Sequence, residues 1–296
     1  MRVPAAYLGL IVIWSTTPLA IKWSSDGVSF LFGSATRMCL GLACVLLVCR
    51  LRGLALRRDR AAITAYATAA IGIFPAMFCA YWGAQFIPSG WLAIVFGLSP
   101  MLTAVLSCLL LPGHTMTGMR VLAQLCGVAG LAVVFHSGFA SGAQAVYGVA
   151  AILASTLFHC LSSVLVKRLN SDLPAMTLVA GGLCLSVPAY LACWYFFDGQ
   201  WPAQVSDHAL SAILYLGCIA TTGGFVMFYF VLKHLQPGQV ALVSFISPLS
   251  ALALGHWFNG EALEPRVLIG AALVLMALAL HEVLPPLLAR RASVVS

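Results

Sequence analysis

Polar and aromatic side chains inside otherwise apolar stretches are the residues of this chain that could do chemistry. Indole and phenol rings offer apolar faces, while hydroxyl and imidazole groups offer hydrogen bonds. A few placed polar groups among apolar walls are typical of a pocket that binds a small amphipathic molecule. The predicted substrate-binding set is Trp14, Thr17, Tyr81, Trp82, Ser99, His159, Ser163, Tyr229, Ser244 and Ser247.

Structural roles compete with binding at several of these positions. Tyr81, Trp82 and Tyr229 lie near expected helix ends, where an interfacial aromatic belt would also place them. The serines also suit close packing between helices. The sequence alone leaves both interpretations open, as it does for the three proline positions predicted to be hinges. These are Pro18, Pro100 and Pro248, each of which would either kink its helix or open it toward a cavity.

His159 is the histidine whose role matters most, because it is expected in the middle of a helix with Ser155 and Ser163 one turn away on either side. It would pack against a neighbouring helix, contact the substrate or, less simply, carry a proton, since its unperturbed pKa is about 6.5. The acidic residues all fall in connections or near helix ends: Asp26, Asp59, Asp172, Asp198, Asp207, Glu261, Glu264 and Glu282. Their placement favours a facilitator or exchanger over a carrier driven through a buried carboxylate.

Two cations lie within or beside the first apolar stretches. Lys22 is near a helix end, from which its ammonium can reach the interface. Arg37 lies about two turns into a helix, so it needs a carbonyl or an anion as partner. We expect either a structural role for Arg37 or attraction of a substrate carboxylate.

The elements that must position these residues are membrane helices. The chain of 296 residues is 62% hydrophobic and 8% charged, against about 25% charged in a soluble domain. The ten cysteines lie in apolar runs without a CxxC pair, and we expect neither a metal nor a cofactor. Neither HExxH nor GxSxG occurs, so we do not expect an enzyme. The predicted transmembrane segments are roughly 4–23, 30–50, 62–86, 89–111, 118–136, 146–168, 174–197, 208–233, 238–258 and 265–288.

A duplication organises these ten segments. When the sequence is shifted by 148 positions, Tyr81 falls on Tyr229, Gly90 on Gly238, and Ser99-Pro100 on Ser247-Pro248. If the helices alternate, twelve of the fifteen Lys and Arg lie on one side, which the positive-inside rule makes cytoplasmic, together with both termini. Five helices per copy is an odd number, so the second copy must be inverted. We predict repeats at 1–140 and 141–288 and a cytoplasmic tail at 289–296.

The ten helices, the Trp14 to Pro18 segment and the two Ser-Pro helices resemble the drug/metabolite transporter superfamily, EamA type. The turn Phe258-Asn259-Gly260-Glu261 is similar to that family's Gly-Glu turn, whereas the first copy has His114 at the acidic position. The resemblance implies a central cavity lined by helices 1, 3, 4, 6, 8 and 9. Its aromatic residues are similar to those of YddG-like exporters of aromatic amino acids.

We therefore expect an all-α membrane protein that exports small amphipathic metabolites, in particular amino acids, by alternating access. A nucleotide-sugar or phosphate-ester carrier is the alternative, although such substrates require more cations than Arg37 and Lys22 provide. An intramembrane enzyme or a channel is less favoured. The expected partners are the lipid bilayer of the cell (inner) membrane and a small-molecule substrate, with the chain as a monomer or homodimer. The basic net charge of +7 does not indicate nucleic acid, because its distribution follows membrane topology.

Overall fold

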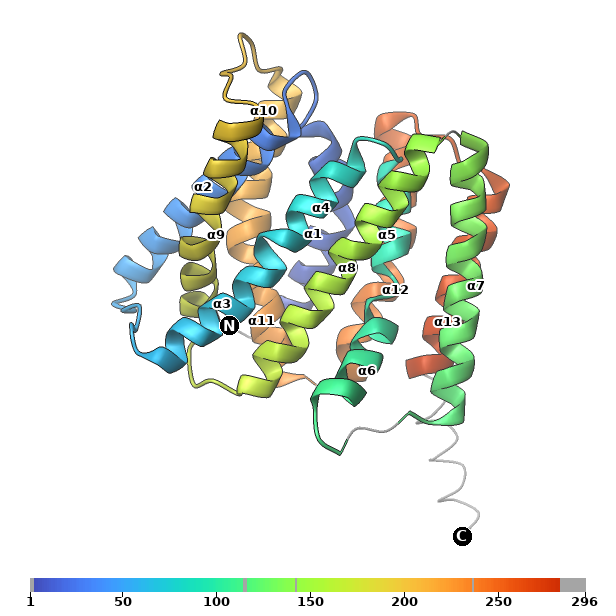
Figure 1. Ribbon diagram of the computed structural model, residues 1–296, viewed down its shortest axis with the longest axis horizontal. Helices are drawn as coiled ribbons and strands as arrows, with labels where there is room; N and C mark the ends of the chain where they lie inside the picture. The colour runs from blue at the N-terminus through green and yellow to red at the C-terminus, as the bar shows by residue number, and fades with distance from the viewer. Residues whose placement is uncertain (1–2, 114–115, 142, 236, 283–296) are drawn as a thin grey trace.

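The computed structural model describes residues 3–113, 116–141, 143–235 and 237–282, and over these ranges the chain is helical, without strands. Figure 1 shows the helices standing side by side. They group into ten consecutive passes within the described residues. The passes are α1 (Val3–Trp23), α2 (Phe30–Leu51), α3 (Arg60–Ile73) with α4 (Pro75–Ala84), α5 (Ser89–Phe96) with α6 (Ser99–Leu110), α7 (Gly118–Ser141), α8 (Ala143–Leu169), α9 (Ala175–Phe197), α10 (Asp207–Leu214) with η1 (Tyr215–Gly224) and α11 (Phe225–His234), α12 (Pro237–Asn259) and α13 (Pro265–Glu282).

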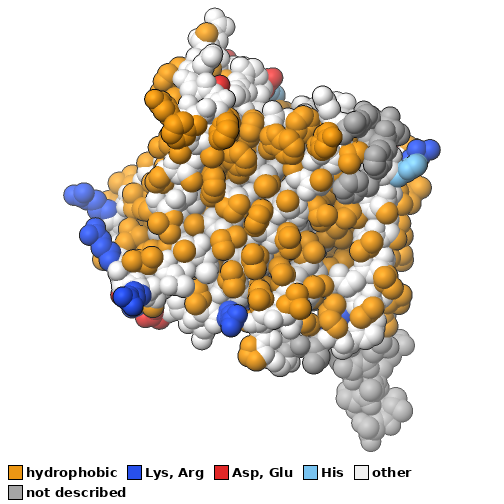
Figure 2. All heavy atoms as spheres, in the orientation of Figure 1, with side chains coloured by type: hydrophobic (Ala, Val, Ile, Leu, Met, Phe, Trp, Pro, Cys, Tyr) orange, Lys and Arg blue, Asp and Glu red, His pale blue; other side chains and the backbone are white. Residues whose placement is uncertain are grey.

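The composition of these passes is that of membrane helices. Seven spans in the described residues are long and apolar enough to cross a bilayer, and parts of α7 and α13 form shorter apolar helices. Figure 2 shows hydrophobic side chains over the sides of the bundle, while the Lys and Arg visible on this face lie mainly along its left and lower edges. A surface of this kind is stable only when lipid covers it. The predicted all-α fold with ten membrane helices in two repeats is confirmed.

The third pass of the first copy is broken rather than continuous as the 62–86 segment predicted. Pro75 has no backbone N–H, and Phe74 adopts φ −88° and ψ −74° between α3 and α4. The hydroxyl of Tyr190, on α9, donates to the carbonyl oxygens of Ile73 and Phe74 at 2.8 and 3.2 Å. These bonds satisfy carbonyl groups beside the break, at a depth where water is absent.

The third pass of the second copy is irregular for another reason. Tyr215–Gly224 forms a π-helix, η1, in the middle of the pass. The hydroxyl of Thr222 donates within this turn to the carbonyl of Gly217 at 3.3 Å, five residues back. Segments of π-helix are often found at functional sites. Both copies therefore depart from a regular helix at matching places by different means.

The two copies interlock through matching passes. In Figure 1, α1 rises from the lower end of the bundle, whereas α8, the first pass of the second copy, descends from the upper end. The inverted arrangement brings α7 against α13, where a Cβ on Gly130 would lie 3.0 Å from the carbonyl of Gly270. Gly130 and Gly270 thus let the two halves pack closely at this crossing.

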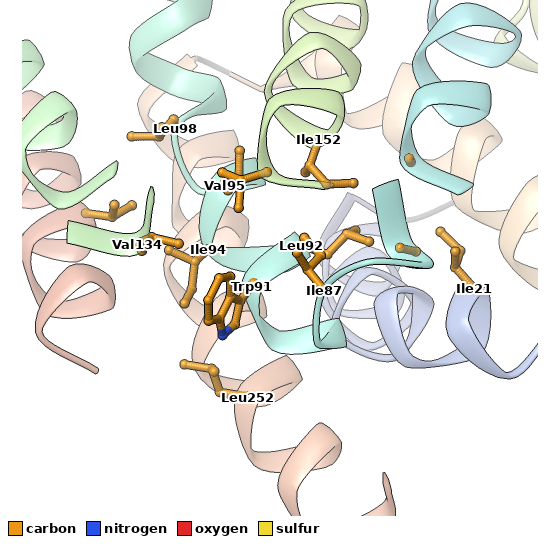
Figure 3. Close-up of a cluster of buried hydrophobic side chains, with 14 of the residues drawn as sticks. Ile21, Ile87, Trp91, Leu92, Ile94, Val95, Leu98, Val134, Ile152 and Leu252 are labelled. Atoms are coloured by element: carbon orange, nitrogen blue, oxygen red, sulfur yellow. The ribbon is translucent and has the colours of Figure 1, made fainter. Parts of the chain in front are cut away.

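One large apolar cluster also spans the two copies. Figure 3 shows Trp91 of α5 beside Leu252 of α12, with Val95 of α5 and Leu98 of the α5–α6 junction farther from Leu252, and Ile21 of α1 at the right-hand side. A Cβ on Gly90 would meet Leu252 at 2.5 Å, so α5 and α12 approach closely because Gly90 has no side chain. This crossing holds the two Ser-Pro segments near the centre of the molecule.

Candidate functional site

A cavity lies where the passes of the two copies meet, and its walls come from α1, α2, α4, α5, α6, α8, η1, α11 and α12. The empty space between these walls, the open mouth included, is about 790 Å³. Most lining residues are apolar or aromatic, and a few are polar. The polar or charged lining residues are Thr17, Arg37, Ser99, His159 and Ser247.

The α1 wall contributes Trp14, Thr17 and Pro18, as the sequence predicted for a cavity-facing helix. Pro18 cannot donate a backbone hydrogen bond, yet α1 continues through it as one helix. The hydroxyl of Thr17 donates to the carbonyl of Ile13 at 2.6 Å. Because that bond occupies the hydroxyl hydrogen, Thr17 has only an acceptor left for a ligand.

His159 lies in a cage of aromatic rings. Its ring centroid is 5.8 Å from Trp14, 4.9 Å from Phe228 and 6.2 Å from Phe96. Its Nδ1 atom is buried and has no hydrogen-bond partner within the described part of the chain. A buried polar atom of this kind requires a partner, because leaving it unpaired costs about 1–3 kcal/mol. Of the roles considered from sequence, this geometry favours contact with a molecule in the cavity.

The two Ser-Pro segments lie against each other across the cavity. A Cβ on Gly97 would be 3.5 Å from Cγ of Pro248. The hydroxyl of Ser99 donates to the carbonyl of Phe96 at 2.5 Å, whereas Oγ of Ser247 is buried and has no partner among the described residues. The Ser247 hydroxyl is therefore available to a ligand, and the Ser99 hydroxyl has its hydrogen engaged.

Arg37 lines the same cavity although it is outside the predicted substrate-binding set. Its side chain is 2% exposed, Nε donates to Oγ1 of Thr221 at 2.9 Å, and Nη1 donates to the hydroxyl of Tyr81 at 3.4 Å. The sequence predicted a carbonyl or an anion as its partner, and the observed partners are hydroxyl groups instead. A cation in mid-helix was the available signal, but its partner on η1 is 184 positions away in the chain.

Comparison with known proteins identifies the family of this chain. The profile of the EamA-like transporter family matches residues 4–136 and 146–281. The chain belongs to the EamA-like transporter family. The chain is therefore a membrane transporter of the drug/metabolite transporter superfamily.

The similar proteins include several transporters with diverse names. The uncharacterized transporter YvbV of Bacillus subtilis is 25% identical over 67% of this chain and 64% of its own length, so the match leaves about a third of that relative uncovered. YoaV of the same organism is 21% identical over 93% of this chain and 94% of its length. A probable terminal-alkyne amino-acid exporter of Streptantibioticus cattleyicolor is 24% identical over 89% of this chain and 87% of its own.

A solved crystal structure has the same fold. It superimposes with a TM-score of 0.69 at 23% identity, over 95% of this chain and 97% of that one. At this identity the likeness shows the fold alone.

The EamA-like transporter places some predicted site residues outside the central cavity. Tyr81 is fully buried and lines a second hollow toward the upper end, while its hydroxyl contacts Arg37 of the first. Its neighbour Trp82 is 38% exposed on the outer face. Tyr229 is buried beside Phe225 and Phe228. The part of these three residues in binding stays a prediction.

The remaining predicted positions have roles within their helices or lie outside the residues that the structure describes. The hydroxyl of Ser163 donates to the carbonyl of His159 at 2.8 Å, within α8. Pro100 lies at the start of α6 and is not among the residues found to line the cavity, whereas Pro18 and Pro248 line it. The side chain of Ser244, the turn residue His114 and the predicted tail 289–296 lie outside the described residues.

The acidic residues of the transporter lie in connections or at helix ends, as predicted. Glu261 reaches from the α12–α13 connection to the start of α5, where its carboxylate accepts from the backbone N–H of Ser89 at 3.0 Å and of Gly90 at 3.3 Å. A carboxylate there complements the positive end of the helix dipole. The second copy thus caps the fourth pass of the first.

Proposed function

We propose that this EamA-like transporter exports small amphipathic metabolites, namely amino acids with an apolar or aromatic side chain, by alternating access. The observation that carries the proposal is the composition of the central cavity, in which Trp14, Phe96 and Phe225 supply ring faces and His159 and Ser247 supply unpaired polar atoms. The similarity to a probable terminal-alkyne amino-acid exporter supports the same substrate class.

The duplicated architecture supports the alternating-access part of the proposal. Inverted repeats allow one half to rock against the other around a site at their interface. The cavity has walls from passes of both copies, including α1 and α5 of the first and α8 and α12 of the second. Gly97 and Ala220 of η1 line this cavity, so these two irregular segments lie where a hinge needs backbone freedom.

We propose transport without coupling to a buried carboxylate. Within the described lining, the charged residue is Arg37, and Asp and Glu do not contribute. Carriers driven by protons or sodium ions commonly use an acidic residue inside the membrane. Flux of a neutral amino acid should therefore be nearly the same with and without an imposed pH gradient. A gradient-dependent accumulation would contradict this part and would point to His159.

We propose that the protein resides in the cytoplasmic (inner) membrane with both termini in the cytoplasm. The side of the bundle on which the sequence places twelve of the fifteen Lys and Arg would face inside. Arg52→Cys and Gln200→Cys test this, because both positions are exposed in connections at opposite ends. An impermeant maleimide added to intact cells should label Gln200→Cys alone, with the wild-type chain as the blank. Labelling of both from outside would refute the orientation.

The decisive experiment is counterflow in proteoliposomes loaded with single amino acids. A carrier shows uptake of labelled substrate that is stimulated by unlabelled substrate on the other side, and neither a channel nor an enzyme does so. Trp14→Ala and His159→Ala should reduce the flux about tenfold or more, because each removes a wall of the site. Trp257→Ala is the matched control, since Trp257 is 75% exposed. Unchanged flux in the first two variants would remove the site from consideration.

Monomeric or dimeric assembly is also open to measurement. We propose a monomer or homodimer as the working unit, with the complete cavity inside one chain. Light scattering of the detergent-solubilised protein would distinguish these states from a higher oligomer.

A further inference from the structure

We infer that Arg37 is the carboxylate-binding residue of the cavity, so that the transporter selects its substrates by their acid group rather than by their amine. The inference rests on the proposed function and deepens it. It predicts that small apolar monocarboxylates without an amine bind the site, and that amines without a carboxylate do not.

The positive charge of Arg37 has an unusual position. Arg37 is on α2 and 2% exposed, and it lines the central cavity. The guanidinium group remains protonated in proteins, so the positive charge cannot be removed by titration. The ion pairs found in the described residues involve Arg57, and Arg37 has no carboxylate within 4 Å there. A permanent cation in a membrane interior is costly unless an anion pairs with it.

Within the described residues, hydrogen bonds use only part of the guanidinium of Arg37. One bond runs from Nε to Thr221, and a long one runs from Nη1 to Tyr81, whose ring centroid is 5.7 Å from Cζ. A guanidinium has five N–H donors in a planar fork. The remaining N–H groups match the two oxygens of a carboxylate, which is the partner that this fork binds most specifically.

The surrounding helices hold Arg37 in place. α2 and η1 approach so closely that a Cβ on Gly217 would lie 3.0 Å from the Arg37 carbonyl, and a Cβ on Gly41 would lie 2.5 Å from Thr221. These two glycines place the Thr221 hydroxyl beside the guanidinium. The π-helix therefore has a positioning role, since it presents Thr221 at this crossing.

The rest of the cavity suits the apolar part of a substrate. The other walls offer rings and methyl groups, which suit an apolar body, and His159 and Ser247 offer single polar atoms. The described lining contains no Asp or Glu that could pair with an ammonium group. Electrostatic recognition in this cavity is thus one-sided and favours the anion.

The test compares four small molecules that share a phenyl ring: phenylalanine, phenylalaninamide, 3-phenylpropionate and phenylethylamine. Each competes in counterflow and is also added to the purified full-length protein during thermal unfolding. For the wild-type protein, 3-phenylpropionate should compete and should raise Tm. The amide and the amine should be weaker by about tenfold or more, the loss expected for an unmade charge-assisted bond.

Arg37→Gln should remove the effect of 3-phenylpropionate while the weak effects of the amide and the amine stay the same. Arg37→Lys should restore part of the acid preference because it restores the charge without the fork. Thr221→Val is the control for a purely structural role, since it breaks the contact of Arg37 with η1 and keeps the cation. It should retain the preference for acids even if its Tm is lower.

The outcomes separate this inference from the proposed function. Counterflow of phenylalanine and phenylalaninamide at equal rates would overturn the inference and leave the transporter proposal standing. Equal losses for all four compounds in Arg37→Gln and Thr221→Val would also overturn it, because Arg37 would then be a structural link. Stabilisation by 3-phenylpropionate that requires Arg37, without flux of any amino acid, would support the inference and refute the proposed function.

Discussion

Ser99-Pro100 and Ser247-Pro248 have the same residues at matching positions of the two copies, but the helices around them differ. In the first copy the helix ends at Phe96 and restarts at Ser99, whereas α12 runs through Ser247 and Pro248 without interruption. Proline removes one backbone donor in both cases. The dipeptide by itself therefore does not decide whether the helix breaks.

The residue two positions before the dipeptide explains the difference. The first copy has Gly97 where the second has Phe245, 148 positions later. Gly97 has helical dihedral angles, but its N–H is shared between the carbonyls of Ala93 and Ile94 at 2.9 and 3.0 Å, which tightens the turn. A Cβ at Gly97 would lie 2.9 Å from the Ile94 carbonyl. Glycine thus permits a break that a larger residue would prevent.

The largest expected effect comes from exchanging this residue between the copies. Gly97→Phe should lower stability by about 3 kcal/mol or more, because the added side chain would meet Ile94 and Val274 and fill the cavity. We expect a much lower yield, or a Tm several degrees below wild type, and loss of counterflow. Gly118→Phe is the matched control, since a Cβ there meets nothing within 4 Å. Normal Tm for Gly97→Phe would show that Gly97 does not decide the break.

The helix cap supplied across the copies should give the next largest effect. Glu261 accepts from Oγ of Ser89 at 2.9 Å as well as from the two backbone donors at the start of α5. Glu261→Ala should cost about 1–3 kcal/mol, because the donors would be left unpaired. Glu264→Ala, three residues later, is the control. Thermal unfolding in detergent measures both, and equal Tm values for the two variants would contradict the capping role.

Much of the fold follows from sequence, because hydropathy and the 148-residue repeat need no knowledge of contacts. The ten passes, their inversion and the cavity positions of Trp14 and His159 could be expected on that basis. The breaks within individual passes could not be expected from the sequence. Pro75 and Pro18 are both prolines within apolar stretches, yet α1 is continuous through Pro18 while α3 ends before Pro75. The difference depends on partners such as Tyr190, which are far away in the chain.

The site was less predictable because adjacent helical residues point about 100° apart, and the sequence does not fix the rotation of a helix. Tyr81 and Trp82 are neighbours in the predicted set, but the first is completely buried and the second is 38% exposed. Apolar wall residues such as Phe96 and Phe225 gave no signal, since their types are common in every pass. Arg37 did give a signal, because it is a charged residue in mid-helix, but its hydroxyl partners are known only from the fold.

A smaller and more selective effect should separate the two serines. Ser99→Ala removes the donor to the Phe96 carbonyl, which Pro100 leaves without its usual helical partner, and should lower stability by about 1 kcal/mol. Ser247→Ala removes a hydroxyl that has no partner in the described structure, so Tm should stay within error while the KM for transport rises. Measuring Tm and counterflow on both variants checks this. A stability loss in Ser247→Ala equal to that in Ser99→Ala would remove the distinction.

The smallest effect is expected where the copies differ most in charge, at the connection between the second and third passes. In the first copy this connection contains Arg57, which bonds Asp59 at 2.9 Å and Asp172 of the α8–α9 connection at 3.0 Å. The corresponding connection of the second copy, between α9 and α10, has exposed Trp201 and fewer charges. The ion pairs are exposed to solvent, where salt screens them.

Arg57→Ala should therefore change Tm by little, and the change should shrink further in high salt. The hydrogen bond from Arg57 lowers the pKa of the Asp59 carboxyl. A carboxyl whose pKa is lower in the folded state stabilises the fold at pH values above the ordinary Asp pKa of about 3.9. This stabilisation is lost as the pH falls through the lowered pKa. The Tm difference between wild type and Arg57→Ala should thus be constant from about pH 5 to pH 8 and vanish in stronger acid. A difference that instead grows between pH 5 and 8 would mean that another titrating group depends on Arg57, and that this connection does more than set the topology of the first copy.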